Sequence, residues 1–261
     1  GGMGGSGAAA GPMGDSKEAE VPPPSSVRFR PPERLVLGCI QVATDVNFDM
    51  EGPALLSKLP GVNARMAKIA FDSEDICAET YEEAMAQGKL RLAADSIRLP
   101  DGYVTVWGIA CTSFSFLISK ERLASQLPPC ARLVTMWDAV CLALRAVGAA
   151  RIAMLTPYCT PVHERNVAMM RAEGFTVARS MHLNLKQDRQ TSGLEPEYLL
   201  ECIRALASGG PADALFLGCS AFRLCLPGLI SGLEAELGVP IVTSTQAFLW
   251  HALRTGGVDD R

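Results

Sequence analysis

Short apolar runs alternate with longer amphipathic stretches along almost the whole chain, and this alternation constrains the fold more than any other feature. Eight runs have the length and composition of strands: 34–41, 65–71, 103–110, 131–135, 150–155, 175–180, 213–218 and 239–243. Most of them are continuously apolar, which is typical of parallel strands buried on both faces. Helices are expected at 73–87, 119–126, 138–147, 161–173, 196–208, 223–237 and 246–254. Strands that alternate with helices predict an α/β fold with parallel sheets flanked by helices.

Proline and glycine mark the ends of these helices. Pro161 and Pro196 stand where a helix should begin, because proline is well tolerated in the first helical turn. Glycines stand just past four expected helix ends, where the left-handed conformation is common, at Gly148, Gly174, Gly238 and Gly256.

A repeat with a spacing of 108 residues relates the two halves of the chain. Cys111 in VWGIACTS aligns with Cys219 in LFLGCSA, and Thr112 aligns with Ser220. The segment 133–148 aligns with 241–256, and this places threonine on threonine and glycine on glycine. The repeat predicts two similar domains related by a pseudo-twofold axis.

The expected domain boundaries follow from this repeat. The first domain comprises 34–136 together with 245–261, and the second comprises 137–244. Each domain offers one cysteine at the carboxyl end of a strand, where open α/β sheets bind their ligands. We therefore expect an active site in the cleft between the two domains.

Composition narrows the function classes. Residues 1–33 are rich in Gly, Ala, Pro and Ser, and we expect them to be disordered. The net charge of −4 argues against a nucleic-acid or anionic-membrane partner, and no apolar run reads as a membrane span. Nine cysteines without C-x-x-C spacing indicate a reduced protein rather than a disulfide scaffold. A cytoplasmic location is expected, although the sequence leaves a targeting segment open.

Two facing thiols can perform acid–base and nucleophilic chemistry without a metal ion or an organic cofactor. A cysteine between a strand and a helix lies near backbone N–H groups, which are expected to lower its pKa. The hydroxyls that follow, on Thr112, Ser113 and Ser220, together with the turn amides, can hold a carboxylate. One thiol can attack or take a proton while the other donates a proton on the opposite face. The chain lacks the usual metal and nucleotide motifs, so we expect neither a metal nor an organic cofactor.

The cysteine motifs ACTS and LGCSA, and the segment GAARIAMLTPYCTPVHERNVAMMRAEGFTV (148–177), resemble the Asp/Glu racemase superfamily. Within it, the chain is most similar to the branch of maleate cis-trans isomerase and arylmalonate decarboxylase, from about Arg34 to Gly257. The residues Glu51, Pro53, Ala54, Leu55 and Leu56 also fit the isomerase pattern E-x-P-A-L-L. A homodimer or tetramer is compatible with this resemblance.

The resemblance implies a role for individual residues. Cys111 would be the thiolate that adds to C2 of maleate, and Cys219 would be the partner that gives and takes the proton. Tyr158 would donate a hydrogen bond to a substrate carboxylate, beside Thr112 and Ser113. The expected function is therefore a cofactor-independent isomerase of a small carboxylate or dicarboxylate.

Several positions depart from the isomerase pattern. Asp45 stands where the isomerases have asparagine, and a carboxylate there would repel a dianion unless it is protonated or points away. Val42, Ala43 and Thr44 replace Pro-Ser-Ser. Trp137 and Asp138 either reshape the pocket or begin a helix with Asp138 in its first turn.

Other functions stay open. The motif CTSFSF is closer to the decarboxylase motif GTSLSF than to the isomerase one, although decarboxylation needs only one thiol. An amino-acid or α-substituted-acid racemase would carry ACNT and GCTH around its cysteines. A binding protein without catalytic activity should show no pair of reactive thiols at Cys111 and Cys219.

Overall fold

The computed structural model describes residues 1–2, 32–99, 103–129 and 131–259. Most of the segment predicted to be disordered, 1–33, lies outside the described residues. The folded unit begins at Glu33. None of its described helices is long and apolar enough to cross a membrane.

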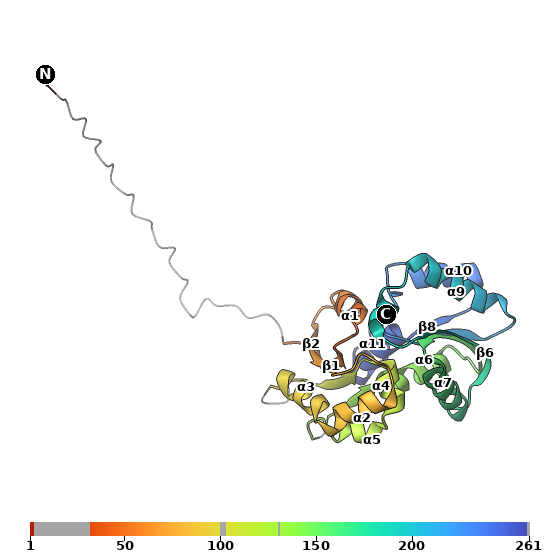
Figure 1. Ribbon diagram of the computed structural model, residues 1–261, viewed down its shortest axis with the longest axis horizontal. Coiled ribbons are helices and arrows are strands. Elements are labelled where there is room, and N and C mark those ends of the chain that lie inside the picture. The colour runs from red at the N-terminus through yellow and green to blue at the C-terminus, as the bar shows by residue number, and fades with distance from the viewer. Residues whose placement is uncertain (3–31, 100–102, 130, 260–261) are drawn as a thin grey trace. The chain divides into compact units, whose positions relative to one another are not determined.

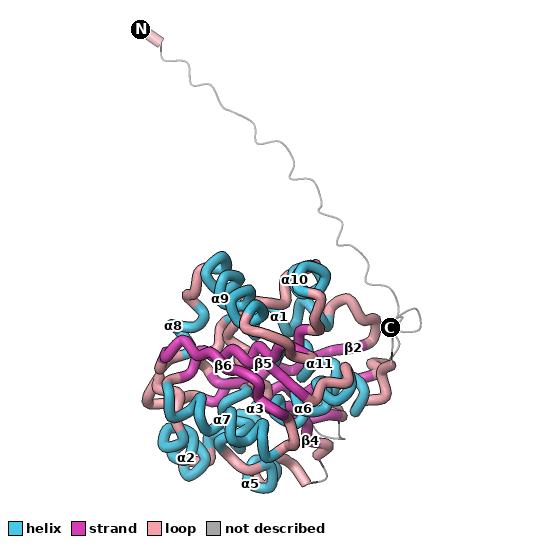
Figure 2. Tube along the Cα trace, turned by 90° about the vertical axis from the view of Figure 1, so that its right-hand side faces the viewer, coloured by secondary structure: helices cyan, strands magenta, loops and turns pink. Residues whose placement is uncertain are grey.

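Two four-stranded parallel sheets form the centre of the fold, and all eight predicted strands are confirmed (Figures 1 and 2). The first sheet has the order β2 (Val62–Ile69), β1 (Leu35–Val42), β3 (Val106–Ile109) and β4 (Leu133–Thr135). The second has the order β6 (Thr176–Leu185), β5 (Arg151–Tyr158), β7 (Ala214–Leu217) and β8 (Ile241–Thr243). The two sheets therefore repeat one strand order, with β3 and β7 in equivalent places. The fold is α/β, as predicted.

Helices flank both sheets (Figure 2). In chain order they are α1 (Asn47–Leu56), α2 (Ala78–Ala86), α3 (Lys89–Ile97), α4 (Thr112–Leu117), α5 (Lys120–Ala124), α6 (Met136–Ala146), α7 (Thr160–Ala172), α8 (Asp188–Ser192), α9 (Pro196–Ser208), α10 (Leu229–Leu237) and α11 (Ser244–Thr255). The seven predicted helical segments each contain a helix, but α1, α3, α4 and α8 were not predicted. The segment 73–87 is helical only from Ala78, and 223–237 only from Leu229.

The ends of the helices follow the predicted signals with two shifts of one residue. Pro196 begins α9 directly after Glu195, whereas α7 begins at Thr160 and Pro161 is its second residue. Gly148, Gly174 and Gly238 adopt the expected positive φ angles of 75°, 93° and 65°. At the end of α11, the residue with positive φ is Gly257, at 79°, and not Gly256.

The helices α6 and α11 connect the two halves. Each begins at a threonine, Thr135 or Thr243, whose hydroxyl accepts a hydrogen bond from a backbone N–H of the first turn. Although α11 follows β8 of the second sheet, it packs against α6 and against β3 and β4 of the first sheet. Gly108 in β3 leaves room for the buried ring of Phe248, which a Cβ atom at this position would meet. These contacts are compatible with the predicted domain boundaries, which stay a prediction.

Candidate active site

Cys111 is separated from β3 by Ala110 and is the residue that precedes α4. Its side chain is 3% exposed, and its Sγ atom lies 3.5 Å from the Ser113 hydroxyl. The Ser115 hydroxyl donates a 2.5 Å hydrogen bond to the backbone carbonyl of Cys111, which fixes the turn from strand to helix. This is the predicted strand–cysteine–helix arrangement.

Cys219 lies beyond β7, separated from the strand by Gly218. It is 5% exposed, and the backbone N–H of Ala221 points to its Sγ atom at 3.4 Å. A turn follows it rather than the expected helix, because α10 begins only at Leu229. The two thiols lie close enough that a charge on Cys111 raises the pKa of Cys219. The structure thus brings the repeat-related cysteines together.

The pKa values of the two thiols are raised, and the sequence-based expectation of lowered values is wrong. Burial raises the pKa of Cys111 to about 12, and the charge of Asp188 adds to this effect. Burial also raises the pKa of Cys219 well above its usual value, with Asp188 and Asp45 contributing. Loss of solvation therefore outweighs the opposing hydrogen bonds from Ser113 and from backbone N–H groups.

Tyr158, at the end of β5, is fully enclosed beside the two thiols. It is 1% exposed, its ring packs edge-on against Phe116 at 5.8 Å, and its hydroxyl has no hydrogen-bond partner among the described residues. Burial raises its pKa, and the charges of Cys219 and Cys111 raise it further. A buried hydroxyl without a partner is costly and uncommon, so it marks a position where a bound ligand would accept a hydrogen bond.

Tyr81, on α2, is a site residue that no motif or repeat in the sequence identifies. Its hydroxyl shares a 2.7 Å hydrogen bond with Ser113, which in turn faces the Cys111 thiol. The pKa of Tyr81 is raised by burial and by the neighbouring Cys111. Ser113 is therefore held between the phenol and the thiol, and its role in binding a substrate stays a prediction.

Asp45 enters the site from the turn between β1 and α1. One of its carboxyl oxygens accepts hydrogen bonds from the backbone N–H groups of Asn47 and Phe48, both at 3.1 Å, and so starts α1. Burial raises the pKa of this carboxyl, and the nearby Ser220 hydroxyl and the two N–H groups oppose the rise. The carboxyl of Asp45 is buried beside the Ser220 hydroxyl, and its charge raises the pKa of both thiols.

Asp188, the first residue of α8, is the second site residue that sequence reasoning missed. It is 4% exposed and accepts a 2.7 Å hydrogen bond from the hydroxyl of Thr44. Burial raises its pKa to about 7, with the charge of Asp45 contributing. In the sequence it stands within KQDRQ, which resembles an exposed polar turn, so no local signal identifies it.

The side chains of Thr112 and Trp137 pack against buried neighbours around the site and do not enlarge its pocket. The hydroxyl of buried Thr112 donates to the sulfur of Met136 at 3.1 Å. Trp137 is buried against Phe116, with ring centroids 5.6 Å apart. Of the two possibilities for Trp137 and Asp138, the structure shows the helix start, since the backbone N–H of Asp138 is capped by Thr135.

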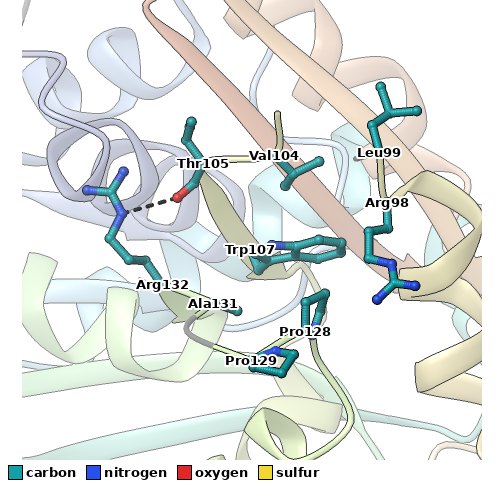
Figure 3. A pocket seen from close by; sticks show the side chains of 9 residues that line it. All are labelled: Arg98, Leu99, Val104, Thr105, Trp107, Pro128, Pro129, Ala131 and Arg132. Atoms are coloured by element: carbon teal, nitrogen blue, oxygen red, sulfur yellow. Dashed lines mark hydrogen bonds between the residues drawn. The ribbon is translucent and has the colours of Figure 1, made fainter. Parts of the chain in front are cut away.

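A separate cavity of about 540 Å³ lies at the opposite end of β3 (Figure 3). It is lined around Trp107 by side chains that include Arg98 and Arg132. Cys111 follows the carboxyl end of this strand, whereas Val104 and Thr105 of the cavity precede it. This cavity is therefore distinct from the cysteine site. Among the described residues, no group of three or more His, Cys, Asp or Glu side chains is arranged to hold a metal ion.

Comparison with known proteins places this arrangement in a family. A maleate isomerase from Nocardia farcinica is 26% identical over 230 residues, which are 84% of this chain and 89% of the relative. The crystal structure of the maleate isomerase Iso from Pseudomonas putida superposes with a TM-score of 0.73 at 23% identity, covering 87% of this chain and 94% of that one. A mutant Nocardia farcinica maleate cis-trans isomerase with a covalently bound succinylcysteine intermediate superposes with a TM-score of 0.71 at 24% identity, covering 85% and 92%.

The sequence profile of the arylmalonate decarboxylase family matches residues 68–261, which include both cysteines, Tyr158 and Asp188. The predicted resemblance to the maleate isomerase and arylmalonate decarboxylase branch of the Asp/Glu racemase superfamily is thereby confirmed. This chain belongs to the arylmalonate decarboxylase family.

Proposed function

We propose that this protein is a cofactor-independent two-cysteine isomerase that converts a small cis-alkene carboxylic acid into its trans isomer. The observation that carries the proposal is the pair Cys111 and Cys219, which follow the equivalent strands β3 and β7 and lie close enough that a charge on Cys111 raises the pKa of Cys219. A single thiol would suffice for a decarboxylase. Two thiols on opposite faces of a substrate allow one to add to the double bond while the other transfers the proton.

The proposed reaction is balanced without a co-reactant. The thiolate of Cys111 adds to one alkene carbon, and the thiol of Cys219 gives its proton to the other, which leaves a thioether and a Cys219 thiolate. The former double bond is now single and rotates. Cys219 then takes a proton back from the same carbon, the double bond re-forms, and the Cys111 thiolate departs. A succinylcysteine is the intermediate named for the mutant relative, and the same kind of adduct is proposed here.

Binding roles are proposed for the polar groups around the thiols. Tyr158, with its unpartnered hydroxyl, would donate to a substrate carboxylate. The hydroxyls of Thr112, Ser113 and Ser220 and the neighbouring backbone N–H groups would surround the same carboxylate. Asp45 would face the rest of the substrate. We also propose that the protein is cytoplasmic and that it assembles into a homo-oligomer.

Exchange of each site cysteine for serine tests the proposal. Cys111→Ser and Cys219→Ser should each lower kcat at least about a thousandfold, because serine is a much weaker nucleophile and acid at neutral pH. The melting temperature should move by only about 2–4 °C, since serine nearly matches the thiol in shape. Cys39→Ser, at a buried thiol in β1, is the matched control and should keep full turnover.

Mass spectrometry supplies a second readout. Cys219→Ser, mixed with the cis substrate, should accumulate an adduct on Cys111, because the serine cannot readily remove the proton that releases it. Full activity in either site variant would contradict the two-thiol mechanism.

The family match keeps decarboxylation as a second candidate function. The match to the arylmalonate decarboxylase profile and the motif CTSFSF favour it. A decarboxylase would release CO₂ from a malonate and would keep activity in Cys111→Ser, since it needs one proton donor. A racemase would exchange an α-hydrogen of a chiral acid with solvent and would need both thiols.

A further inference from the structure

Two buried carboxyl groups face the thiol pair. Asp45 is 1% exposed and Asp188 is 4% exposed, and they come from opposite halves of the fold. Thr44, which precedes Asp45, donates the 2.7 Å hydrogen bond that holds Asp188. The charges with the largest influence on the thiols are Asp188 and Asp45, and both are negative. The ammonium group of Lys68 donates hydrogen bonds to the backbone carbonyl of Asp45 and to the carboxylate of Asp49.

The position of Asp188 is fixed by the residues on both sides of it. The carbonyl of Lys186 accepts a 2.7 Å hydrogen bond from the backbone N–H of Ile76, and Gln187 forms an isolated bridge with Asp75. Arg189 forms an ion pair with Glu74 at 2.5 Å. Three consecutive contacts therefore attach the start of α8 to the segment before α2. Asp188 is held in the site by these contacts and is not a freely moving surface residue.

The Tyr158 hydroxyl is an independent sign that a ligand belongs beside these carboxyl groups. It is buried without a partner among the described residues, and its pKa is affected by both thiols and by Asp188. It can donate a hydrogen bond to a ligand carboxylate. One substrate carboxylate therefore has a donor in the site, whereas above about pH 7, where Asp188 is ionised, a second one placed near Asp45 and Asp188 would meet like charge.

We propose that Asp45 and Asp188 select a substrate that carries one carboxylate and, in place of a second, a group that donates hydrogen bonds, either an uncharged amide or an ammonium. This inference rests on the proposed function, because it names the class of acid that the same site accepts. A carboxylate accepts hydrogen bonds from an amide N–H and pairs with an ammonium, while it repels another carboxylate. The half-amide of a cis-butenedioic acid fits this description, and the dianion maleate does not.

Isothermal titration calorimetry with saturated four-carbon acids tests the selection separately from the chemistry. Succinate, succinamate and 4-aminobutyrate cannot isomerise, so binding is measured whether or not the protein is an isomerase. At pH 8 the full chain should bind succinamate or 4-aminobutyrate at least tenfold more tightly than succinate. The tighter of the two identifies the second group as an amide or an ammonium.

Asp188→Asn isolates the charge, because asparagine can still accept the hydrogen bond from Thr44. It should bind succinate at least fivefold more tightly than the unchanged chain does and should lose most of the preference for the donor ligand. Asp72→Asn, at an exposed aspartate paired with Lys89, is the control and should leave the ratio unchanged.

The inference is wrong if succinate binds as tightly as both other ligands. It is also wrong if Asp188→Asn leaves the preference unchanged. Absence of millimolar binding by succinamate and 4-aminobutyrate overturns it too. If the preference holds while no cis-alkene acid is isomerised, only the proposed function fails.

Discussion

At the scale of single residues, the site keeps polar groups in conditions that cost stability. The Tyr158 hydroxyl has no hydrogen-bond partner in the described part of the chain, and Asp45, Asp188 and both thiols are buried with raised pKa values. Each would be more favourable in water or beside a hydrogen-bond partner. Buried polar groups that lower stability are common where a bound ligand supplies their missing partners. Their presence here supports the position of the active site that the repeat predicts.

Tyr158→Phe should therefore separate stability from activity. Loss of an unpartnered buried hydroxyl should stabilise the fold by about 1–2 kcal/mol, while kcat/KM should fall about 10–100-fold through the lost bond to a charged substrate. Urea unfolding and steady-state kinetics measure the two effects. The control is Tyr81→Phe, which removes a hydroxyl that does have a partner and should destabilise the fold instead. Equal stability changes in the two variants would contradict this reading of Tyr158.

Asp188 should make stability fall as the pH rises. Its pKa is about 7 in the folded protein and 3.8 without the fold, so between these values the folded state holds a proton that the unfolded state has lost. The free energy of unfolding should decrease from about pH 4 to pH 7 and then level off, by an amount on the order of 3 kcal/mol for this group. Chemical denaturation at pH 5 and pH 8 measures it. Asp188→Asn should flatten the decrease, and an unchanged slope would show that other groups cause it.

At the scale of the elements, α1 of the first half holds the loop that carries Cys219. Asn47 at its start donates a 2.6 Å hydrogen bond to the carbonyl of Ala221, two residues after Cys219. Glu51, one turn later, accepts a hydrogen bond from the backbone N–H of Cys225 at 2.8 Å. Because α1 belongs to the first half and the loop to the second, these bonds set the position of Cys219 relative to Cys111.

Asn47→Ala should loosen the loop that carries Cys219. The free energy of unfolding should fall by about 1–2 kcal/mol, because the buried carbonyl of Ala221 loses its partner. The value of kcat should fall more than KM rises, since the proton donor moves while the binding groups at Cys111 stay. Asn63→Ala, at an exposed amide on β2, serves as the comparison and should change neither quantity appreciably. An unchanged kcat in Asn47→Ala would show that α1 does not position Cys219.

The sequence predicts the strands more completely than the helices. It predicts some residues of the site and misses others. Continuous apolar runs identify all eight strands because buried parallel strands leave little room for polar residues. The helix α1 was missed because it contains Gly52 and Pro53, and α8 because five polar residues carry no helical period. Cys111, Cys219 and Tyr158 follow from motifs and the repeat. Asp188 and Tyr81 reach the site only through tertiary contacts, so no local pattern could identify them.

At the scale of the whole molecule, the proposed function depends on the duplication. The same strand order appears twice, and Cys111 and Cys219 each stand two residues beyond the equivalent strands β3 and β7. One half alone offers a single thiol in a buried pocket with a raised pKa. In the proposed mechanism, the other half supplies the second thiol, which acts as the proton donor that reversible addition to a double bond requires.

Proton NMR of the purified chain with maleate and with its half-amide in D₂O tests this account most directly. We predict that the olefinic signals of the cis acid give way to those of the trans acid, faster for the half-amide, and that Cys111→Ser shows no conversion. Conversion at an equal rate by Cys111→Ser would contradict the account. So would the absence of conversion with both acids, together with CO₂ release from a malonate or deuterium uptake at the α-carbon of a chiral acid.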